Sequence, residues 1–141
     1  MTYSKSLPLF YSSLLEFLMT SKQHLMAIGK EYDLTSMQTI TLLLTNMDEP
    51  KPMNTFQKLF NCDASNITGI VDGLEEKNLV TRGEKADDRR VKIVLLTIEG
   101  AKVQEQITRD LIKADDSMLH ELSTVELSQF RNIMEKISKA A

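Results

Sequence analysis

The spacing of apolar residues changes twice along this chain, and these changes limit the fold more than any other feature. Up to Asn78 the apolar residues recur every three or four positions, as on one face of a helix. From Leu79 to Leu96 they alternate with polar residues, which is typical of β-strands, and after Thr97 the helical spacing returns. The chain is therefore predicted to be mainly α-helical, with one small β-hairpin between helices, an α+β architecture.

Long helices are expected at both ends of the chain. The first has a stripe of apolar residues from Leu7 to Ile28 and a second stripe turned by about 100°. A helix that is apolar on two sides has more surface to bury than one small domain covers, so we favour a helix shared with a second chain over a core helix of a monomer. Thr97 is predicted to cap a helix that runs to about Glu121, and Ser123 to open the last helix through a capping box.

Shorter helices are predicted between these ends. Thr35 is the expected N-cap of the second helix, which two prolines then stop in an exposed loop. Its predicted inward residues are Met37, Ile40, Leu43, Leu44 and Met47. A short helix over 54–60 is followed by a turn, and Asp63 is placed to cap a helix over 64–78. The hairpin strands are expected over 80–84 and 91–96, around a polar tip at 85–90.

This order of elements is typical of DNA-binding proteins. A short helix, a tight turn and a second helix with small polar residues on its exposed face form a helix-turn-helix, whose second helix can enter the major groove. A cationic hairpin after it makes a winged helix, because the hairpin can reach phosphates or the minor groove. The predicted DNA contacts are Ser65, Asn66, Thr68 and Gly69 on the helix and Lys85, Arg89, Arg90 and Lys92 on the hairpin.

The charge balance first argues against nucleic acid, since 17 basic and 20 acidic residues give a net charge of −3. Resolved by region, eight basic and seven acidic residues lie between Lys51 and Thr97, a net charge of +1. The other segments hold nine basic and thirteen acidic residues, a net charge of −4. The excess acid therefore lies mainly outside the predicted reading module.

Catalytic and metal-binding patterns are poorly represented, and we predict no enzyme, metal or cofactor. The chain has no nucleophile elbow, zinc-protease motif or glycine-rich phosphate loop. His24 and His120 are more often structural than catalytic on such helices, and Asp116 with His120 supplies too few ligands for a metal. Cys62 is favoured as a small buried residue over a redox sensor. A single Cys and no membrane-spanning or signal-peptide pattern predict a cytoplasmic protein without a membrane partner.

Several short motifs resemble the MarR family of bacterial winged-helix regulators, over essentially the whole chain. Leu-Thr-x-x-Gln at 34–38 opens the second helix, and the segment 62–72 is similar to the family's recognition helix. Asn-Leu-Val at 78–80 resembles the usual Gly-Leu-Val exit. The most specific match is Asp-Arg-Arg at 88–90, followed by Leu-Thr-x-x-Gly at 96–100.

The resemblance implies one domain over 1–141, with a DNA-binding lobe at 34–97 and dimerisation helices at 4–32 and 98–141. It further implies a homodimeric repressor on a pseudopalindromic duplex operator, and an ion pair between Asp72 and the wing residue Arg90. Members respond to small aromatic or amphipathic effectors that bind between the dimerisation helices and the lobe. The residues considered for such a pocket, each as easily core, are Tyr11, Phe17, Met26 and Tyr32.

One position departs from the family pattern. Gly73 stands where an Arg usually follows the helix aspartate, and we expect this to remove a cation from the exposed face and shift DNA affinity toward the wing. The alternative function is a helical dimer whose winged helix contacts protein, with DNA binding weakened or lost through this change and the acidic balance.

Overall fold

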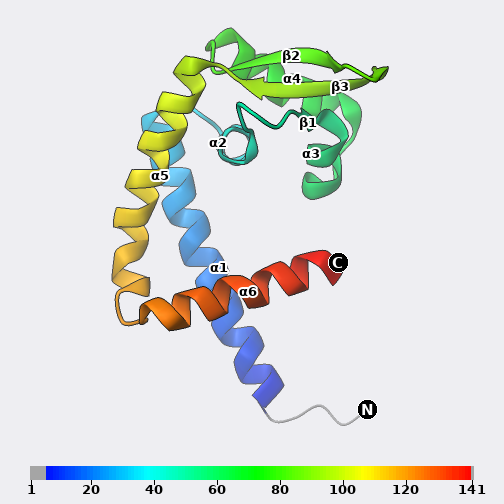
Figure 1. Ribbon diagram of the computed structural model, residues 1–141. Coiled ribbons are helices and arrows are strands. Elements are labelled where there is room, and N and C mark those ends of the chain that lie inside the picture. Colours follow the sequence, from blue (N-terminus) through cyan, green and yellow to red (C-terminus); the bar gives the residue numbers. More distant parts are fainter. Residues whose placement is uncertain (1–5, 141) are drawn as a thin grey trace.

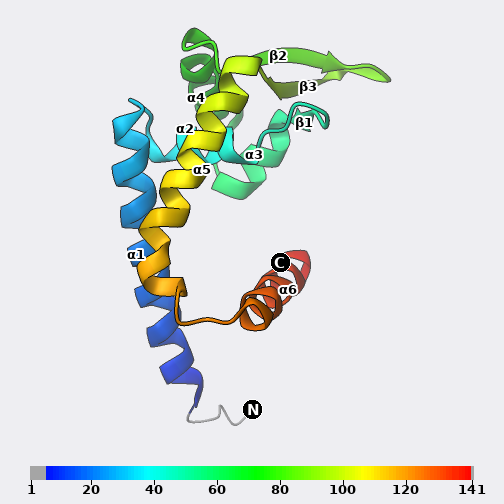
Figure 2. The same ribbon diagram turned by 60° about the vertical axis from the view of Figure 1, so that its left-hand side comes forward.

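The computed structural model describes residues 6–140, except for the side chain of Ser117, and consists of six helices and three strands. Residues 4, 5 and 141 of the predicted dimerisation segments lie outside the described residues. Helix α1 (Ser6–Glu31) runs beside α5 (Ile98–Leu119), and the two form the long axis of the molecule (Figure 1). Helix α6 (Thr124–Ala140) turns away from this pair at the end opposite the sheet (Figure 2).

The lobe at the other end contains α2 (Ser36–Leu44), α3 (Met53–Phe60), α4 (Ala64–Glu76) and a small antiparallel sheet. Strand β1 (Lys51–Pro52) pairs with β3 (Asp88–Leu96), which pairs in turn with β2 (Val80–Lys85). The expected loop at the two prolines therefore contributes a short edge strand, a position that tolerates proline because its missing amide can face outward. The mainly helical fold with a small β-wing is confirmed.

The helix starts follow the predicted caps. Thr35 and Gln38 form a capping box at α2, in which each side chain bonds the other residue's backbone amide. Asp63 caps α4, and Ser123 forms the predicted box with Glu126 at α6. Each cap satisfies amides that the first helical turn leaves without partners, which explains why these residues fix the boundaries.

The Leu-Thr-x-x-Gly motif joins the sheet to α5. Thr97 Oγ1 accepts from the Gly100 amide at 2.8 Å and donates to the Asn78 carbonyl at 2.7 Å. A Cβ on Gly100 would overlap the Leu79 carbonyl, so only glycine lets the first turn of α5 approach this closely. Asn78 adopts a left-handed conformation with φ 60°, which accounts for asparagine where glycine is usual.

The hydrophobic core lies in the lobe and where α1 and α5 join it. Its largest fully buried apolar side chains come from α2, α3, α4, the sheet and α5, namely Leu42, Phe56, Ile67, Val71, Leu74, Val80, Val94 and Ile107. The predicted inward face of α2 is wrong for three of its five residues, because Met37, Leu44 and Met47 are exposed. Leu43 does pack against the core, and the fully buried positions are Thr39, Thr41 and Leu42. By contrast, α6 buries no residue in this chain.

Candidate nucleic-acid interface

A tight turn sets the start of α4. Asn61 is left-handed with φ 50°, and Asp63 then accepts hydrogen bonds from the Asn66 amide at 2.9 Å and the Ser65 hydroxyl at 2.8 Å. The Asn66 amide bond, followed by the Ser65 bond, holds the pKa of Asp63 below its ordinary value. The side chain is therefore a charged cap at neutral pH, and it fixes the first turn.

The outer face of α4 carries the four predicted helix contacts. Ser65, Asn66, Thr68 and Gly69 are all exposed, whereas Ile67 on the opposite face is buried. Thr68 Oγ1 donates to the Ala64 carbonyl at 2.8 Å, and no described residue forms a hydrogen bond with the Asn66 side chain. The structure thus gathers four small, uncharged residues on the outer face of the first turns of α4, next to the Asp63 cap.

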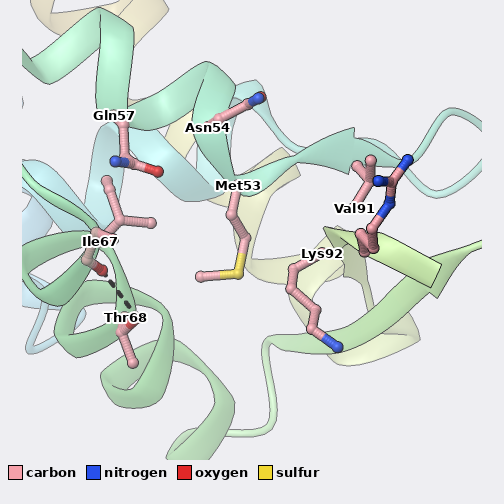
Figure 3. A pocket seen from close by; sticks show the side chains of 9 residues that line it. Met53, Asn54, Gln57, Ile67, Thr68, Val91 and Lys92 are labelled. Carbon is pink, nitrogen blue, oxygen red and sulfur yellow. Dashed lines mark hydrogen bonds between the residues drawn. The ribbon is translucent and has the colours of Figure 1, made fainter. Parts of the chain in front are cut away.

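A groove separates this surface from the wing. It encloses about 290 Å³ between α3, the start of α4 and β3 (Figure 3). Met53 lies between Thr68 on one wall and Lys92 on the other (Figure 3). Asn54 and Gln57 of α3 also line it and were missed by sequence reasoning, although their i, i+3 spacing places them together on α3.

The wing is longer and has a shorter tip than predicted. Its strands extend to Lys85 and Asp88, so only residues 86 and 87 form the turn, and Arg89 and Arg90 lie within β3. Lys92 Nζ lies 2.9 Å from Glu84 Oε1 across the hairpin. No described residue forms an ion pair with Arg89, whose exposed guanidinium is therefore available to an anion.

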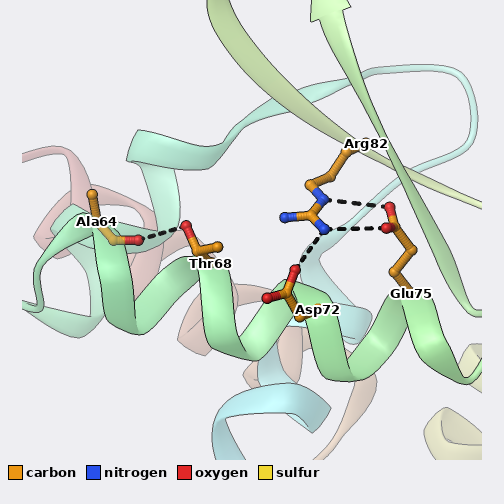
Figure 4. A network of polar contacts seen from close by, with 5 residues as sticks. All are labelled: Ala64, Thr68, Asp72, Glu75 and Arg82. Carbon is orange, nitrogen blue, oxygen red and sulfur yellow. Dashed lines mark hydrogen bonds and ion pairs between the residues drawn. The ribbon is translucent and has the colours of Figure 1, made fainter.

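The predicted ion pair between Asp72 and Arg90 is wrong. Asp72 Oδ1 lies 2.5 Å from Arg82, which also bonds Glu75 at 3.1 Å (Figure 4). Arg90 instead bonds Asp88, two residues before it, at 3.1 Å. Arg82 lies on the same side of β2 as the buried Val80 and pairs with Val94 across the hairpin, whereas Arg90 lies four residues nearer the tip than Val94.

The Arg82 cluster also shifts the titration of its members. Arg82 holds the pKa of Glu75 below its ordinary value, mainly through the side-chain hydrogen bond. The same bond, helped by Asp72, raises the pKa of Arg82. Both carboxylates of α4 that face β2 are thus paired with one guanidinium of the wing, and the three side chains link the helix to the hairpin.

Known proteins share this architecture. A sequence model of the MarR family matches residues 34–92, from α2 into β3. The HTH-type transcriptional regulator SarZ of Staphylococcus saprophyticus is 31% identical over 100 residues, which cover 71% of this chain and 66% of SarZ. The crystal structure of the transcriptional regulator BldR from Sulfolobus solfataricus superposes with a TM-score of 0.76 at 26% identity, covering 96% of this chain and 99% of BldR.

A third likeness includes a nucleic acid. A mutant of S. aureus MepR, bound to an oligodeoxyribonucleotide, superposes with a TM-score of 0.61 at 25% identity. The match covers 93% of this chain and 98% of MepR. This chain belongs to the MarR family. It is therefore a winged-helix transcriptional regulator of a DNA-binding family and not an enzyme.

Gly73 does not leave a gap in the exposed face of this MarR-family chain. It is half-buried against α2, and a Cβ there would overlap the side-chain amide of Gln38. The glycine permits close packing of α4 on the start of α2. Its effect on DNA affinity, through the cation that an arginine would place at this position, stays a prediction.

The four residues considered for a ligand pocket do not lie together. Phe17 lines a cavity of about 310 Å³ between α1, α5 and α6, where it contacts Phe130 edge to face. Tyr32 lines a separate cavity of about 520 Å³ on α5. Tyr11 and Met26 are 53% and 49% exposed and line neither cavity. Phe17 and Tyr32 thus line two different cavities, because Phe17 lies in the middle of α1 while Tyr32 follows its last residue, Glu31.

The histidines make structural contacts. His24 Nδ1 lies 2.7 Å from Asp115 Oδ1 and so links α1 to α5. His120 contacts the backbone carbonyl of Asp116 at 3.1 Å and the Glu121 carboxylate at 3.0 Å. Among the described residues there is no group of three or more potential metal ligands. None of the described helices has the length and apolarity needed to cross a bilayer.

Proposed function

We propose that this MarR-family regulator is a cytoplasmic repressor that binds a pseudopalindromic duplex operator as a homodimer. The observation that carries the proposal is the uncharged outer face of α4 and the basic strand β3, which flank one groove. A helix face of small polar residues suits base edges, while Arg90 and Lys92 at the opposite wall suit phosphates. In this proposal residues 34–97 form the DNA-binding lobe.

The dimer is proposed from apolar surface that this chain leaves uncovered. Exposed large apolar residues gather on α1 and α6, and α6 buries none of its 17 residues. Those on α1 are Leu9, Phe10, Tyr11, Leu15, Leu18, Met19 and Met26. Those on α6 are Val125, Leu127, Phe130, Ile133, Met134 and Ile137. Contiguous apolar surface of this extent is rare on a monomer, so the described parts of 4–32 and 98–141 are the proposed dimer contacts.

Analytical ultracentrifugation tests the dimer. Ile133→Asp places a charge in the apolar stripe of α6 and should convert a dimer into monomers at micromolar concentration. Asn132→Asp is the matched control, because it adds the same carboxylate on the other side of the helix. A wild-type monomer, or equal sedimentation of the two variants, would contradict the proposal.

Salt dependence tests the DNA contact. The plot of log affinity against log salt has a negative slope of about 0.9 per phosphate contact. Arg89→Ala with Arg90→Ala removes two contacts from each protomer and should make this slope less steep by about 1.8 per protomer. Arg131→Ala on α6 removes one cation far from the wing and should leave the slope unchanged. A slope unaffected by the wing variant would rule out the proposed phosphate contacts. Derepression of a reporter in a deletion strain would support the repressor role.

We also propose a small amphipathic acid as effector, in the cavity beside Tyr32. Its lining combines the apolar Ile112 with the cations Arg109 and Lys113, close to the junction of α1 with the lobe. Benzoate is a suitable probe, and calorimetry should detect binding that Lys113→Gln weakens. Lys136→Gln on α6 is the control. If the wild type and both variants bind benzoate equally well, the cavity beside Tyr32 is not the effector site.

A further inference from the structure

We infer that the base pairs read by α4 in the major groove are A·T pairs, an inference that rests on the proposed DNA binding. It starts from the exposed side chains of α4, which include no cation. The helix contains no Arg or Lys between Ala64 and Glu76. Bidentate contact from Arg or Lys to the O6 and N7 of guanine is the commonest way to specify a G·C pair. That contact is not available from α4.

Two cations beside the second half of α4 are already engaged. Lys77 follows the helix and bonds the backbone and carboxylate of Asp33. Arg82 is held between Asp72 and Glu75. The same two carboxylates point from α4 toward Arg82 of the wing, so they are not presented to the N4 donor of cytosine (Figure 4). Specific reading by α4 is therefore left to the first two turns.

Asn66 is the adenine reader in this inference. Its side chain is exposed, none of the described residues bonds it, and only its backbone amide is used by the Asp63 cap. A free carboxamide matches the N6 donor and N7 acceptor of adenine, the usual bidentate pairing of asparagine. Ser65 and Thr68 already donate their hydroxyl protons to Asp63 and Ala64, so toward a base they act as acceptors.

Gly69 provides room for the thymine partner. A Cβ at this position would meet no atom within 4 Å, so the fold does not require glycine there. Glycine in a helix interior nevertheless disfavours the helix relative to alanine. The exposed backbone one turn after Ser65, beside the methyl group of Thr68, forms a shallow apolar seat that accepts the C5-methyl of thymine.

Selection of bound duplexes from a random pool tests both the proposed DNA binding and the inferred preference for adenine. The full chain should enrich sites in which the position read by Asn66 is adenine. That position is identified as the one at which Asn66→Ala loses its base preference. The variant should bind the selected site about 5- to 150-fold more weakly for each half-site that loses the contact. Asn132→Ala is the control and should bind like the wild type. Failure to bind any duplex overturns the proposed function, whereas tight binding with guanine or cytosine at the Asn66 position overturns only this inference.

A double-mutant cycle, which combines Gly69→Ala in the protein with uracil in place of thymine in the DNA, tests the proposed methyl contact at Gly69. Gly69→Ala should raise the resistance to urea and yet weaken binding to the selected site. Replacing the contacted thymine by uracil removes only the methyl group, and it should weaken wild-type binding by about fourfold while restoring binding of Gly69→Ala. If uracil affects both proteins equally, the methyl seat is refuted, and the urea measurement separates this result from misfolding.

Discussion

Gln104 is expected to hold the DNA-binding lobe to α5. Its replacement tests how much the hydrogen bonds of this side chain contribute to the free energy of unfolding. Its side-chain amide donates to the carbonyls of Leu42 and Thr45 at 2.8 Å and of Leu43 at 3.2 Å. These carbonyls lie at the end of α2, where helices leave acceptors without partners. One side chain of α5 thus caps a helix of the lobe from outside.

The magnitude follows from the number of bonds that Gln104→Ala removes. Two bonds at 2.8 Å contribute about 1 kcal/mol each, so the free energy of unfolding should fall by about 2 kcal/mol. Gln104→Glu should lower the free energy of unfolding further at neutral pH, because a carboxylate, which cannot donate, replaces the side-chain amide. Burial beside carbonyls raises the pKa of that carboxyl in the folded state, so its protonated form donates again at acidic pH. The free energy of unfolding of Gln104→Glu should therefore rise relative to that of Gln104→Ala as the pH falls.

Urea unfolding at one fixed protomer concentration is the assay, since association would otherwise change the apparent stability. Gln106→Ala is the matched control, because this exposed glutamine lies two residues away on the same helix. The reasoning is refuted if Gln104→Ala lies within about 0.5 kcal/mol of that control, the spread usual for surface substitutions. It is also refuted if the difference in the free energy of unfolding between Gln104→Glu and Gln104→Ala does not shrink at acidic pH.

Three further predictions concern the helix ends. Gly100→Ala should cost about 1–3 kcal/mol, because its methyl overlaps the rigid Leu79 carbonyl, and urea unfolding should detect the loss. Asn78→Ala should cost about 1 kcal/mol while Asn78→Gly stays within about 0.5 kcal/mol, since only alanine is strained at this positive φ; equal losses would contradict this. The bond from Asn66 lowers the pKa of Asp63, so the stability it contributes is present at neutral pH and lost as the pH falls through the lowered value. Asp63→Asn should therefore flatten the acid limb of stability against pH, and an unchanged limb would contradict the cap.

Capping and glycine patterns predicted the helix boundaries, because the contacts that set them join residues close together in the sequence. Thr35, Asp63, Thr97 and Ser123 each bond amides within their own first turn, so sequence alone placed these helix starts. The winged-helix class followed from the order of elements. The partner of Asp72 was harder to predict, because it depends on the register of the hairpin, which places Arg82 opposite Val94 and leaves Arg90 nearer the tip.

The buried face of α2 illustrates a second limit. This helix is apolar around much of its circumference, so periodicity did not select a side. Thr39 and Thr41 are buried because their hydroxyls donate to carbonyls four residues earlier, at 2.8 Å in both cases. A threonine that satisfies its own polar group in this way can be packed like valine, and composition alone does not reveal it.

Helix α5 explains how an event at the far helices can reach the recognition surface. It begins at the sheet, where Thr97 bonds the segment between α4 and β2, and passes α2 at Gln104. Farther along, Asp110 accepts from the Tyr32 hydroxyl at 2.8 Å, and the hydrogen bond raises the pKa of Tyr32. With the His24 contact beyond it, two side-chain contacts join α5 to α1 and to the residue that follows α1. In the proposed dimer, a shift of this pair would act on the sheet through Thr97 and on α2 through Gln104.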